Sequence, residues 1–186
     1  MNQTTRKTAL CGVMSAMALA LMYLIHFPIF PAVPFLEYDP ADIPIFLCTI
    51  ISGTPWGIAM TAIVSIVQFL VVSPQSGWTG AFMHFFATGM YVAVCGTAVH
   101  FMRKKAKETN IVAVAVSFLL GTLAMTFTMF LLDLIIMPAY MGVPVDTVLG
   151  LKWYIIAFNL IKAGANSVIA MLLYIPLKKY MPKFGK

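Results

Sequence analysis

The chain has 186 residues, of which 61% are hydrophobic and only 10% are charged. A soluble domain has about 45–50% apolar and about 25% charged residues, so this composition excludes a water-soluble fold, which would lack the polar side chains to cover its surface. The net charge is +6, but the basic residues are confined to short segments. Membrane topology therefore accounts for them better than a nucleic-acid partner does, and none is expected.

Apolar segments separated by Pro/Gly-rich or charged breaks predict six helices, since a membrane span needs about 20 residues. The second helix is short, and the fifth is expected to end at Pro138. We predict an all-α integral membrane protein in which residues 1–186 form a single domain of six transmembrane helices. The predicted ranges are 8–26, 41–53, 55–73, 80–102, 110–138 and 151–176.

The distribution of basic residues predicts that both termini lie in the cytoplasm. Arg6 and Lys7 precede the first apolar segment, but no A-x-A cleavage site follows, so we expect a retained helix and not a signal peptide. All Lys and Arg residues except Lys152 and Lys162 lie in segments on one predicted side. Those segments are 1–7, 103–109 and 177–186, whereas the predicted outer loops 27–40, 74–79 and 139–150 contain none.

Lys162 is the basic residue that the bilayer tolerates least. It lies ten residues beyond Lys152, about 15 Å further along a helix, and a lysine at that depth costs about 2.5–3.5 kcal/mol on insertion scales. Asn159 and Asn166 share its helical face by their spacing of three and four residues. This stripe predicts a site for a polar, planar ligand, with interhelical hydrogen bonding as the alternative.

The fifth predicted helix carries a second candidate, Asp133, with Thr126 and Met129 on the same side of the helix. The carboxylate is expected either to pair with a lysine of the last helix or to contact the ligand directly. Gln68 and Ser65 of the third helix are weaker candidates.

No metal site is predicted. His84 and His100 have no second ligand at helical spacing and are interpreted as core or interface residues. The cysteines Cys11, Cys48 and Cys95 lie in apolar segments without a C-x-x-C or other ligand-like spacing, so we expect buried or lipid-facing thiols.

The loop 27–40 is stiffened by four prolines and mixes aromatic with acidic residues. It is too apolar for a solvated linker and predicts a lid over a cavity, with the loop 139–150 closing the other side. The alternative is an interfacial loop whose aromatics lie at the level of the lipid headgroups.

Ala16-x-x-x-Ala20 in the first helix gives a smooth strip where another helix can approach closely. The strip serves either packing within the chain or docking of a partner protein.

The segment 35–44, Phe-Leu-Glu-Tyr-Asp-Pro-Ala-Asp-Ile-Pro, resembles the first-loop signature of riboflavin-specific S-components of energy-coupling factor (ECF) transporters, the RibU type. Asn159-x-x-Lys162 is similar to the flavin-contacting pair of that family, and Ala16-x-x-x-Ala20 is similar to its docking motif. The resemblance covers nearly the whole chain.

The resemblance implies a bacterial cytoplasmic-membrane protein that captures riboflavin in a pocket near the outer face, as transported ligand and not as cofactor. It implies partners as well: a transmembrane coupling subunit and two ATPases, which this chain needs because it lacks a G-x-x-x-x-G-K-[ST] phosphate loop. The family's fifth-helix asparagine is absent, with Thr126 or Asp133 as replacements. The ligand-binding residues expected are Leu36, Glu37, Tyr38, Asp39, Thr126, Met129, Asp133, Asn159, Lys162 and Asn166.

Three alternatives remain open. The first is an S-component for another vitamin, since few residues decide the ligand. The second is an intramembrane enzyme, although no G-x-S-x-G or H-E-x-x-H motif is present and Asp133 is the only deep aspartate. The third is a small self-sufficient channel or secondary transporter, although no internal repeat is evident. We therefore do not expect an enzyme.

Overall fold

The computed structural model describes residues 2–72, 77–106 and 111–178. It is an all-helical fold with one minimal antiparallel strand pair, in which Phe27 faces Tyr38 and Pro28 faces Glu37. The elements are α1 (Gln3–Leu24), β1 (Phe27–Pro28), β2 (Glu37–Tyr38), α2 (Asp42–Ser52), α3 (Thr54–Val67), the π-helical turn η1 (Gln68–Val72), α4 (Gly77–Ala106), α5 (Ile111–Met141), α6 (Val145–Gly150) and α7 (Lys152–Leu177).

Within the described residues, five helices are long and apolar enough to cross a membrane: α1, α3 with its π-helical continuation, α4, α5 and α7. Their outward faces carry large apolar side chains, as lipid-facing helices do. α2 has 11 residues and is shorter than a span. All of its residues except Ile51 are buried, because it is apolar on every side and packs against α1, α3, α4 and α7.

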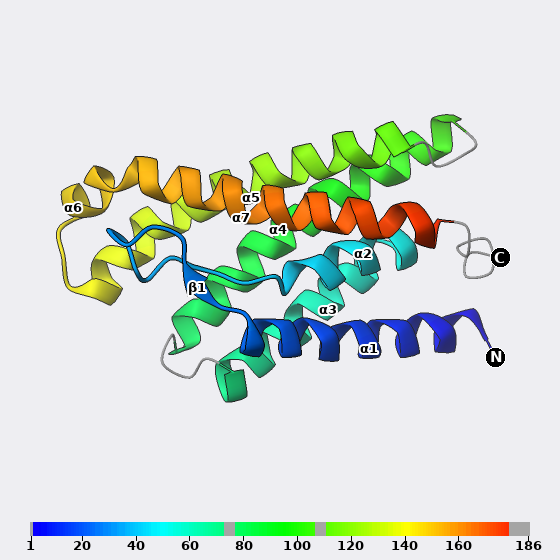
Figure 1. Ribbon diagram of the computed structural model, residues 1–186, viewed down its shortest axis with the longest axis horizontal. Helices are drawn as coiled ribbons and strands as arrows, with labels where there is room; N and C mark the ends of the chain where they lie inside the picture. Colours follow the sequence, from blue (N-terminus) through cyan, green and yellow to red (C-terminus); the bar gives the residue numbers. More distant parts are fainter. Residues whose placement is uncertain (1, 73–76, 107–110, 179–186) are drawn as a thin grey trace.

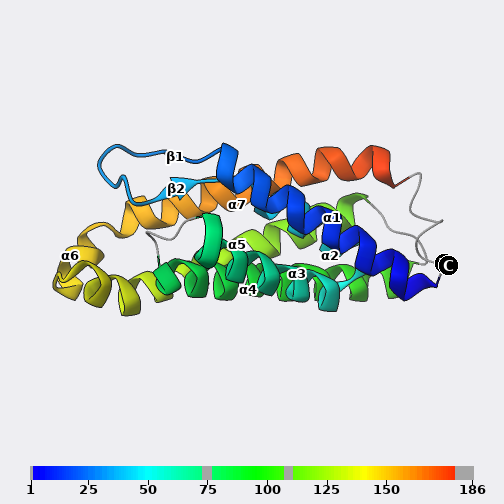
Figure 2. The same ribbon diagram turned by 90° about the horizontal axis from the view of Figure 1, so that it is seen from below.

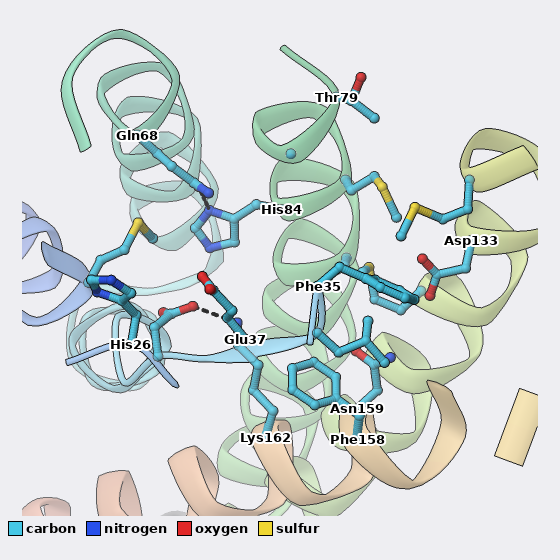
Figure 3. Close-up of a pocket in the computed structure, with 18 of the residues that line it drawn as sticks. His26, Phe35, Glu37, Gln68, Thr79, His84, Asp133, Phe158, Asn159 and Lys162 are labelled. Carbon is cyan, nitrogen blue, oxygen red and sulfur yellow. Dashed lines mark hydrogen bonds and ion pairs between the residues drawn. The ribbon is translucent and has the colours of Figure 1, made fainter. Parts of the chain in front are cut away.

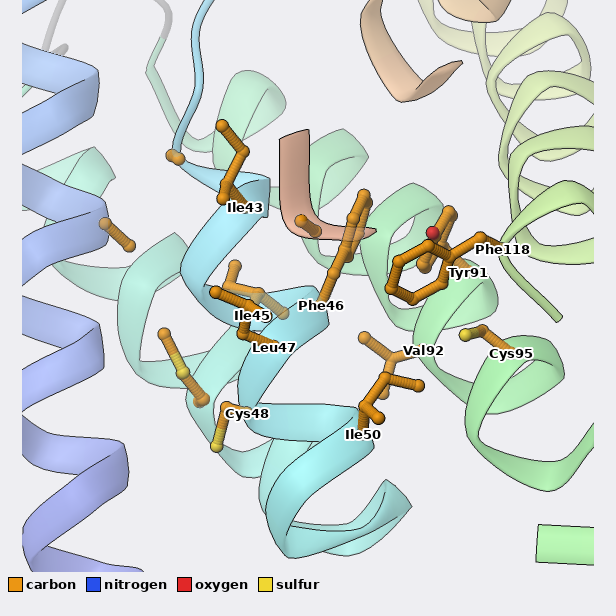
Figure 4. Close-up of a cluster of buried hydrophobic side chains, with 14 of the residues drawn as sticks. Ile43, Ile45, Phe46, Leu47, Cys48, Ile50, Tyr91, Val92, Cys95 and Phe118 are labelled. Carbon is orange, nitrogen blue, oxygen red and sulfur yellow. The ribbon is translucent and has the colours of Figure 1, made fainter. Parts of the chain in front are cut away.

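The core around α2 is apolar and closely packed (Figure 4). The rings of Phe46 and Tyr91 are stacked, with centroids 3.6 Å apart and planes 8° apart, and Phe118 of α5 closes the cluster. Gly57 lets α3 approach this core, since a Cβ there would overlap the side chain of Thr49 and lie 2.8 Å from Val92 Cγ1. The turn from α2 to α3 uses Gly53 at φ 102°, a conformation that side chains disfavour.

The helices run roughly along the long axis of the molecule (Figure 1). The start of α1, the end of α7 and the ends of α4 and α5 that adjoin residues 107–110 all lie at one end. The loop that carries β1 and β2 lies toward the opposite end, near α6, and Figure 2 shows it crossing beside α7. The basic residues Lys107, Lys179, Lys183 and Lys186 lie outside the described residues.

The structure corrects the predicted end of the fifth helix. Pro138 does not end α5, which continues to Met141. Gly142, whose φ is 67°, directly follows the helix, and the Val143 amide donates to the Pro138 carbonyl over 3.1 Å. This is a Schellman arrangement, and a proline one turn earlier is tolerated because it removes only one amide donor.

Two further elements were not predicted. Residues 145–150 form α6 within a segment expected to be a loop, and the first loop contains the strand pair. α3 also changes to a π-helical turn at Gln68, a feature that apolar periodicity does not reveal.

Candidate ligand-binding site

A cavity of about 490 Å³ lies between the loop and the helices. Its walls come from the end of α1, the loop, η1, α4, α5 and α7. Methionine and aromatic side chains make up much of the surface, and a few polar groups converge on it (Figure 3). A concave, largely apolar site with few polar groups is typical of small-molecule binding.

Most of the residues that the sequence assigned to a ligand site do line this cavity, whereas Tyr38, Thr126 and Asn166 do not. Those at the wall are Leu36, Glu37, Asp39, Met129, Asp133, Asn159 and Lys162. Thr126 is buried, and its hydroxyl donates to the Thr122 carbonyl over 2.8 Å within α5. Of the two replacements expected for the fifth-helix asparagine, only Asp133 reaches the cavity.

Asp133 is the most unusual of these groups. It is fully buried, lines the cavity, and neither carboxylate oxygen has a hydrogen-bond partner among the residues that the structure describes. Of the two alternatives expected for Asp133, pairing with a lysine is not found among the described residues, because Lys152 is exposed at the start of α7 and Lys162 pairs with Asp39. A buried, unsatisfied polar group is destabilising by about 1–3 kcal/mol. A ligand group that donates a hydrogen bond to Asp133 would remove this destabilisation.

Lys162 and Asn159 lie one helical turn apart on α7 and both face the cavity. The Lys162 ammonium donates to Asp39 Oδ2 over 2.6 Å, and both side chains are 15% exposed. Since an ammonium has three donors, Lys162 retains donors for a ligand. The Asn159 Nδ2 donates to the Ile155 carbonyl over 2.9 Å. This bond does not involve the Asn159 Oδ1, which can accept a hydrogen bond from another group.

The first loop is seated by both apolar and polar contacts. Val33 and Leu36 are buried in a second cluster with residues of α5, α6 and α7. The Tyr38 hydroxyl donates to Asn166 Oδ1 over 2.8 Å. Burial is the main cause that raises the pKa of this phenol above its ordinary value, with the neighbouring Asp39 adding to the shift, so the hydroxyl keeps its proton at neutral pH.

A polar cluster on the opposite wall was missed. His84 lines the cavity, with Nδ1 2.7 Å from Gln68 Oε1 and Nε2 3.3 Å from Asp42 Oδ1. The Thr88 hydroxyl donates to the same Asp42 oxygen over 2.9 Å. The sequence offered only weak signals, a glutamine and a serine inside an apolar helix, because these residues come from three separate helices.

The small-residue strip of α1 faces outward. Ala9, Gly12, Ala16 and Ala20 are all exposed, and a Cβ at Gly12 would meet nothing within 4 Å. The strip is therefore not used for packing within the described chain, and its surface is open to lipid or to another protein.

Fold and site together define a class: a helical membrane protein that encloses a small-molecule cavity beneath a structured loop. The comparison with known proteins is specific. Residues 6–174 match the family described as ECF transporter, substrate-specific component, and the chain belongs to this family. Members of the family are substrate-binding components of transporters and not enzymes.

One relative and one solved structure match nearly the whole chain, and a second relative matches about two thirds of it. The riboflavin transporter FmnP of Bacillus subtilis (strain 168) is 32% identical over 186 residues, which cover 95% of this chain and 94% of that protein. The riboflavin transporter RibU of Lactococcus lactis subsp. cremoris (strain NZ9000) is 27% identical over 131 residues, 69% of this chain and 61% of that protein. A solved S component of a bacterial ECF transporter has a TM-score of 0.79 at 25% identity and covers 96% of this chain and 98% of its own.

Proposed function

We propose that this protein captures riboflavin in the cavity under the first loop, as the substrate-binding subunit of an ECF transporter in a bacterial cytoplasmic membrane. The observation that carries the proposal is the buried carboxylate of Asp133, which has no hydrogen-bond partner among the described residues and faces a cavity also lined by Asn159 and Lys162. The similarity to two proteins named riboflavin transporters supports the choice of vitamin.

The chemistry of riboflavin suits these walls. The isoalloxazine ring is planar and apolar on its faces, which methionine and aromatic side chains can cover. Its polar edge alternates acceptors and a donor, and the ribityl chain adds hydroxyls. We assign the edge to Asn159 and Lys162, and we assign Asp133 to a donor of the ligand, in place of the family's fifth-helix asparagine. Glu37 is exposed at the cavity rim and disfavours a phosphorylated flavin by repulsion.

Energy for import comes, in this proposal, from a partner module of a transmembrane coupling subunit and two ATPases. Both termini of the chain lie in the cytoplasm, six helices including the short α2 form the membrane domain, and the cavity is near the outer face. The concentration of basic residues in the segments 1–7, 103–109 and 177–186 supports this orientation.

Binding is tested by purifying the protein and recording its absorbance and its quenching of riboflavin fluorescence. Lys152→Ala is the matched control for Lys162→Ala, because Lys152 starts the same helix but is exposed and does not line the cavity. We expect wild type and Lys152→Ala to quench equally and Lys162→Ala to quench only at much higher riboflavin concentrations. A colourless protein that leaves riboflavin fluorescence unchanged would exclude this vitamin as the ligand.

Docking of the coupling subunit is assigned to Ala16 and Ala20, because both are exposed on a smooth strip of α1. Replacing both with leucine should leave riboflavin binding unchanged and abolish uptake into cells. Leu119→Trp on α5 is the control, since Leu119 is 59% exposed on another lipid-facing surface. Normal uptake by the double variant would show that the strip does not dock the partner.

A further inference from the structure

Asn166 is the one member of the polar α7 stripe that faces the loop instead of the cavity. It is fully buried and does not line the cavity. Both ends of its amide are used: Oδ1 accepts from the Tyr38 hydroxyl at 2.8 Å, and Nδ2 donates to the Asp39 carbonyl at 3.1 Å. The Asn166 amide thus bonds two consecutive residues of the loop, Tyr38 and Asp39, which lie 128 and 127 positions away in the chain.

Asp39 connects three parts of the molecule. Its backbone carbonyl accepts from Asn166, its Oδ2 accepts from Lys162 at 2.6 Å, and its Oδ1 accepts from the Ala41 amide at 3.1 Å. The Ala41 contact lies immediately before α2, and the other two contacts lie on α7. All three acceptor atoms of Asp39 therefore have protein donors.

We infer that Tyr38, Asp39 and Asn166 form a clasp that fastens the loop 25–41 to α7, with Asn166 acting as a positioning residue for the loop and not as a ligand contact. The inference deepens the proposed function, because a fastened loop limits ligand release only if the cavity holds a ligand. It assigns different roles to neighbouring residues of one helical stripe: Asn159 and Lys162 face the ligand, and Asn166 holds the cover.

The contacts of the clasp link only protein groups. A hydrogen bond of this kind changes a closing equilibrium by about tenfold. Each contact is therefore weak enough to open and strong enough to slow release. Lys162 differs from Asn166 because it both bonds to Asp39 of the clasp and lines the cavity. It can therefore contact the ligand and the loop at the same time.

The first test uses the ligand-free protein. Tyr38→Phe removes only the hydroxyl, and Asn166→Ala removes both amide contacts. Hydrogen exchange is read at the Val33 and Leu36 amides, which donate to carbonyls within the loop at 3.0 Å. We expect exchange to rise up to tenfold in Tyr38→Phe, further in Asn166→Ala, and no further when Tyr38→Phe is added to Asn166→Ala, since the hydroxyl then has no acceptor to lose.

The matched control is Tyr174→Phe on the same helix. Tyr174 is fully buried and its hydroxyl has no hydrogen-bond partner in the described part of the chain, so its removal should leave loop exchange unchanged. Equal loop exchange in wild type and Tyr38→Phe, or additive effects of the two substitutions, would overturn the clasp. Tyr38→Phe keeps the test decisive if Asn166→Ala does not fold.

The second test uses riboflavin. Release should be faster by up to tenfold in Tyr38→Phe, while the absorbance spectrum of the bound flavin stays that of the wild type, because Tyr38 does not line the cavity. A shifted flavin spectrum in Asn166→Ala would make Asn166 a ligand contact and overturn its positioning role. If riboflavin does not bind the wild type at all, the proposed function fails, and the exchange experiment still decides the clasp.

Discussion

The two ends of α2 lie in opposite environments. Its middle and last turns, around Phe46, are packed against the stacked ring of Tyr91 in a largely apolar core, where Ser52 Oγ is a buried oxygen without a partner among the described residues. Its first residue, Asp42, is fully buried beside the cavity, and its Oδ2 has no partner among the described residues. α2 thus packs into a largely apolar core at one end and holds a buried carboxylate beside the cavity at the other, so the main contributions to stability and to binding have separate locations.

A substitution in the apolar core around α2 is expected to give the largest change in stability. Gly57→Ala places a Cβ against Thr49 and Val92, and Thr49 is itself held by its hydrogen bond to the Ile45 carbonyl at 2.8 Å. We expect unfolding to become easier by about 3 kcal/mol, measured by thermal unfolding of the purified protein.

Gly89→Ala is the matched control for that substitution, because a Cβ at Gly89 of α4 meets nothing within 4 Å. It should leave stability unchanged or raise it by up to about 1 kcal/mol, through the helix propensity of alanine. Equal melting temperatures for the two variants would contradict the description of this end as closely packed.

The cavity end should give the largest change in binding through Lys162→Ala. The substitution removes a charged donor from the ligand and leaves Asp39 without its 2.6 Å partner. Hydrogen bonds to charged groups are worth about 1.5–3 kcal/mol, so affinity should fall by about 10- to 100-fold, measured by riboflavin titration. An unchanged affinity would remove Lys162 from the site.

Asp133→Leu should separate stability from binding in a single variant. Removing a buried carboxylate that has no described partner should raise thermal stability by about 1 kcal/mol in the absence of ligand. The same substitution removes an acceptor from the cavity and should weaken riboflavin binding about tenfold. Reduced stability would show that the carboxylate has a stabilising partner, and unchanged affinity would show that Asp133 does not contact riboflavin.

The smallest expected effect is the pH dependence of the loop. The pKa of Tyr38 is raised above its ordinary value of 10.0, so the contribution of its hydroxyl is fully present below about pH 10 and is lost as the pH rises through the raised pKa. Riboflavin release should be constant between pH 7 and about pH 9 and accelerate at higher pH. The Tyr38→Phe variant should release riboflavin faster than the wild type at neutral pH. At high pH its release should accelerate less than that of the wild type, because it has no Tyr38 hydroxyl to ionise. Ionisation of the ligand itself affects both proteins alike.

The site was partly predictable because some of its geometry is local. Asn159 and Lys162 share a face through the helical period alone, and both do line the cavity. The same period also placed Asn166 on that stripe, but its side chain faces the loop. Periodicity gives the side of a helix on which a residue lies, and it does not give the group that a neighbouring segment places there.

Composition and apolar segments alone determined a helical membrane protein, because so much apolar surface with so few charges is stable only in lipid. They also located the long helices to within a few residues, since backbone hydrogen bonding within each helix is local. Only the tertiary structure decided that Asp39 pairs with Lys162, that Asp133 lacks a described partner, and that His84 joins the cavity wall. These contacts join residues far apart in sequence, and they depend on how the helices pack and where the loop folds back.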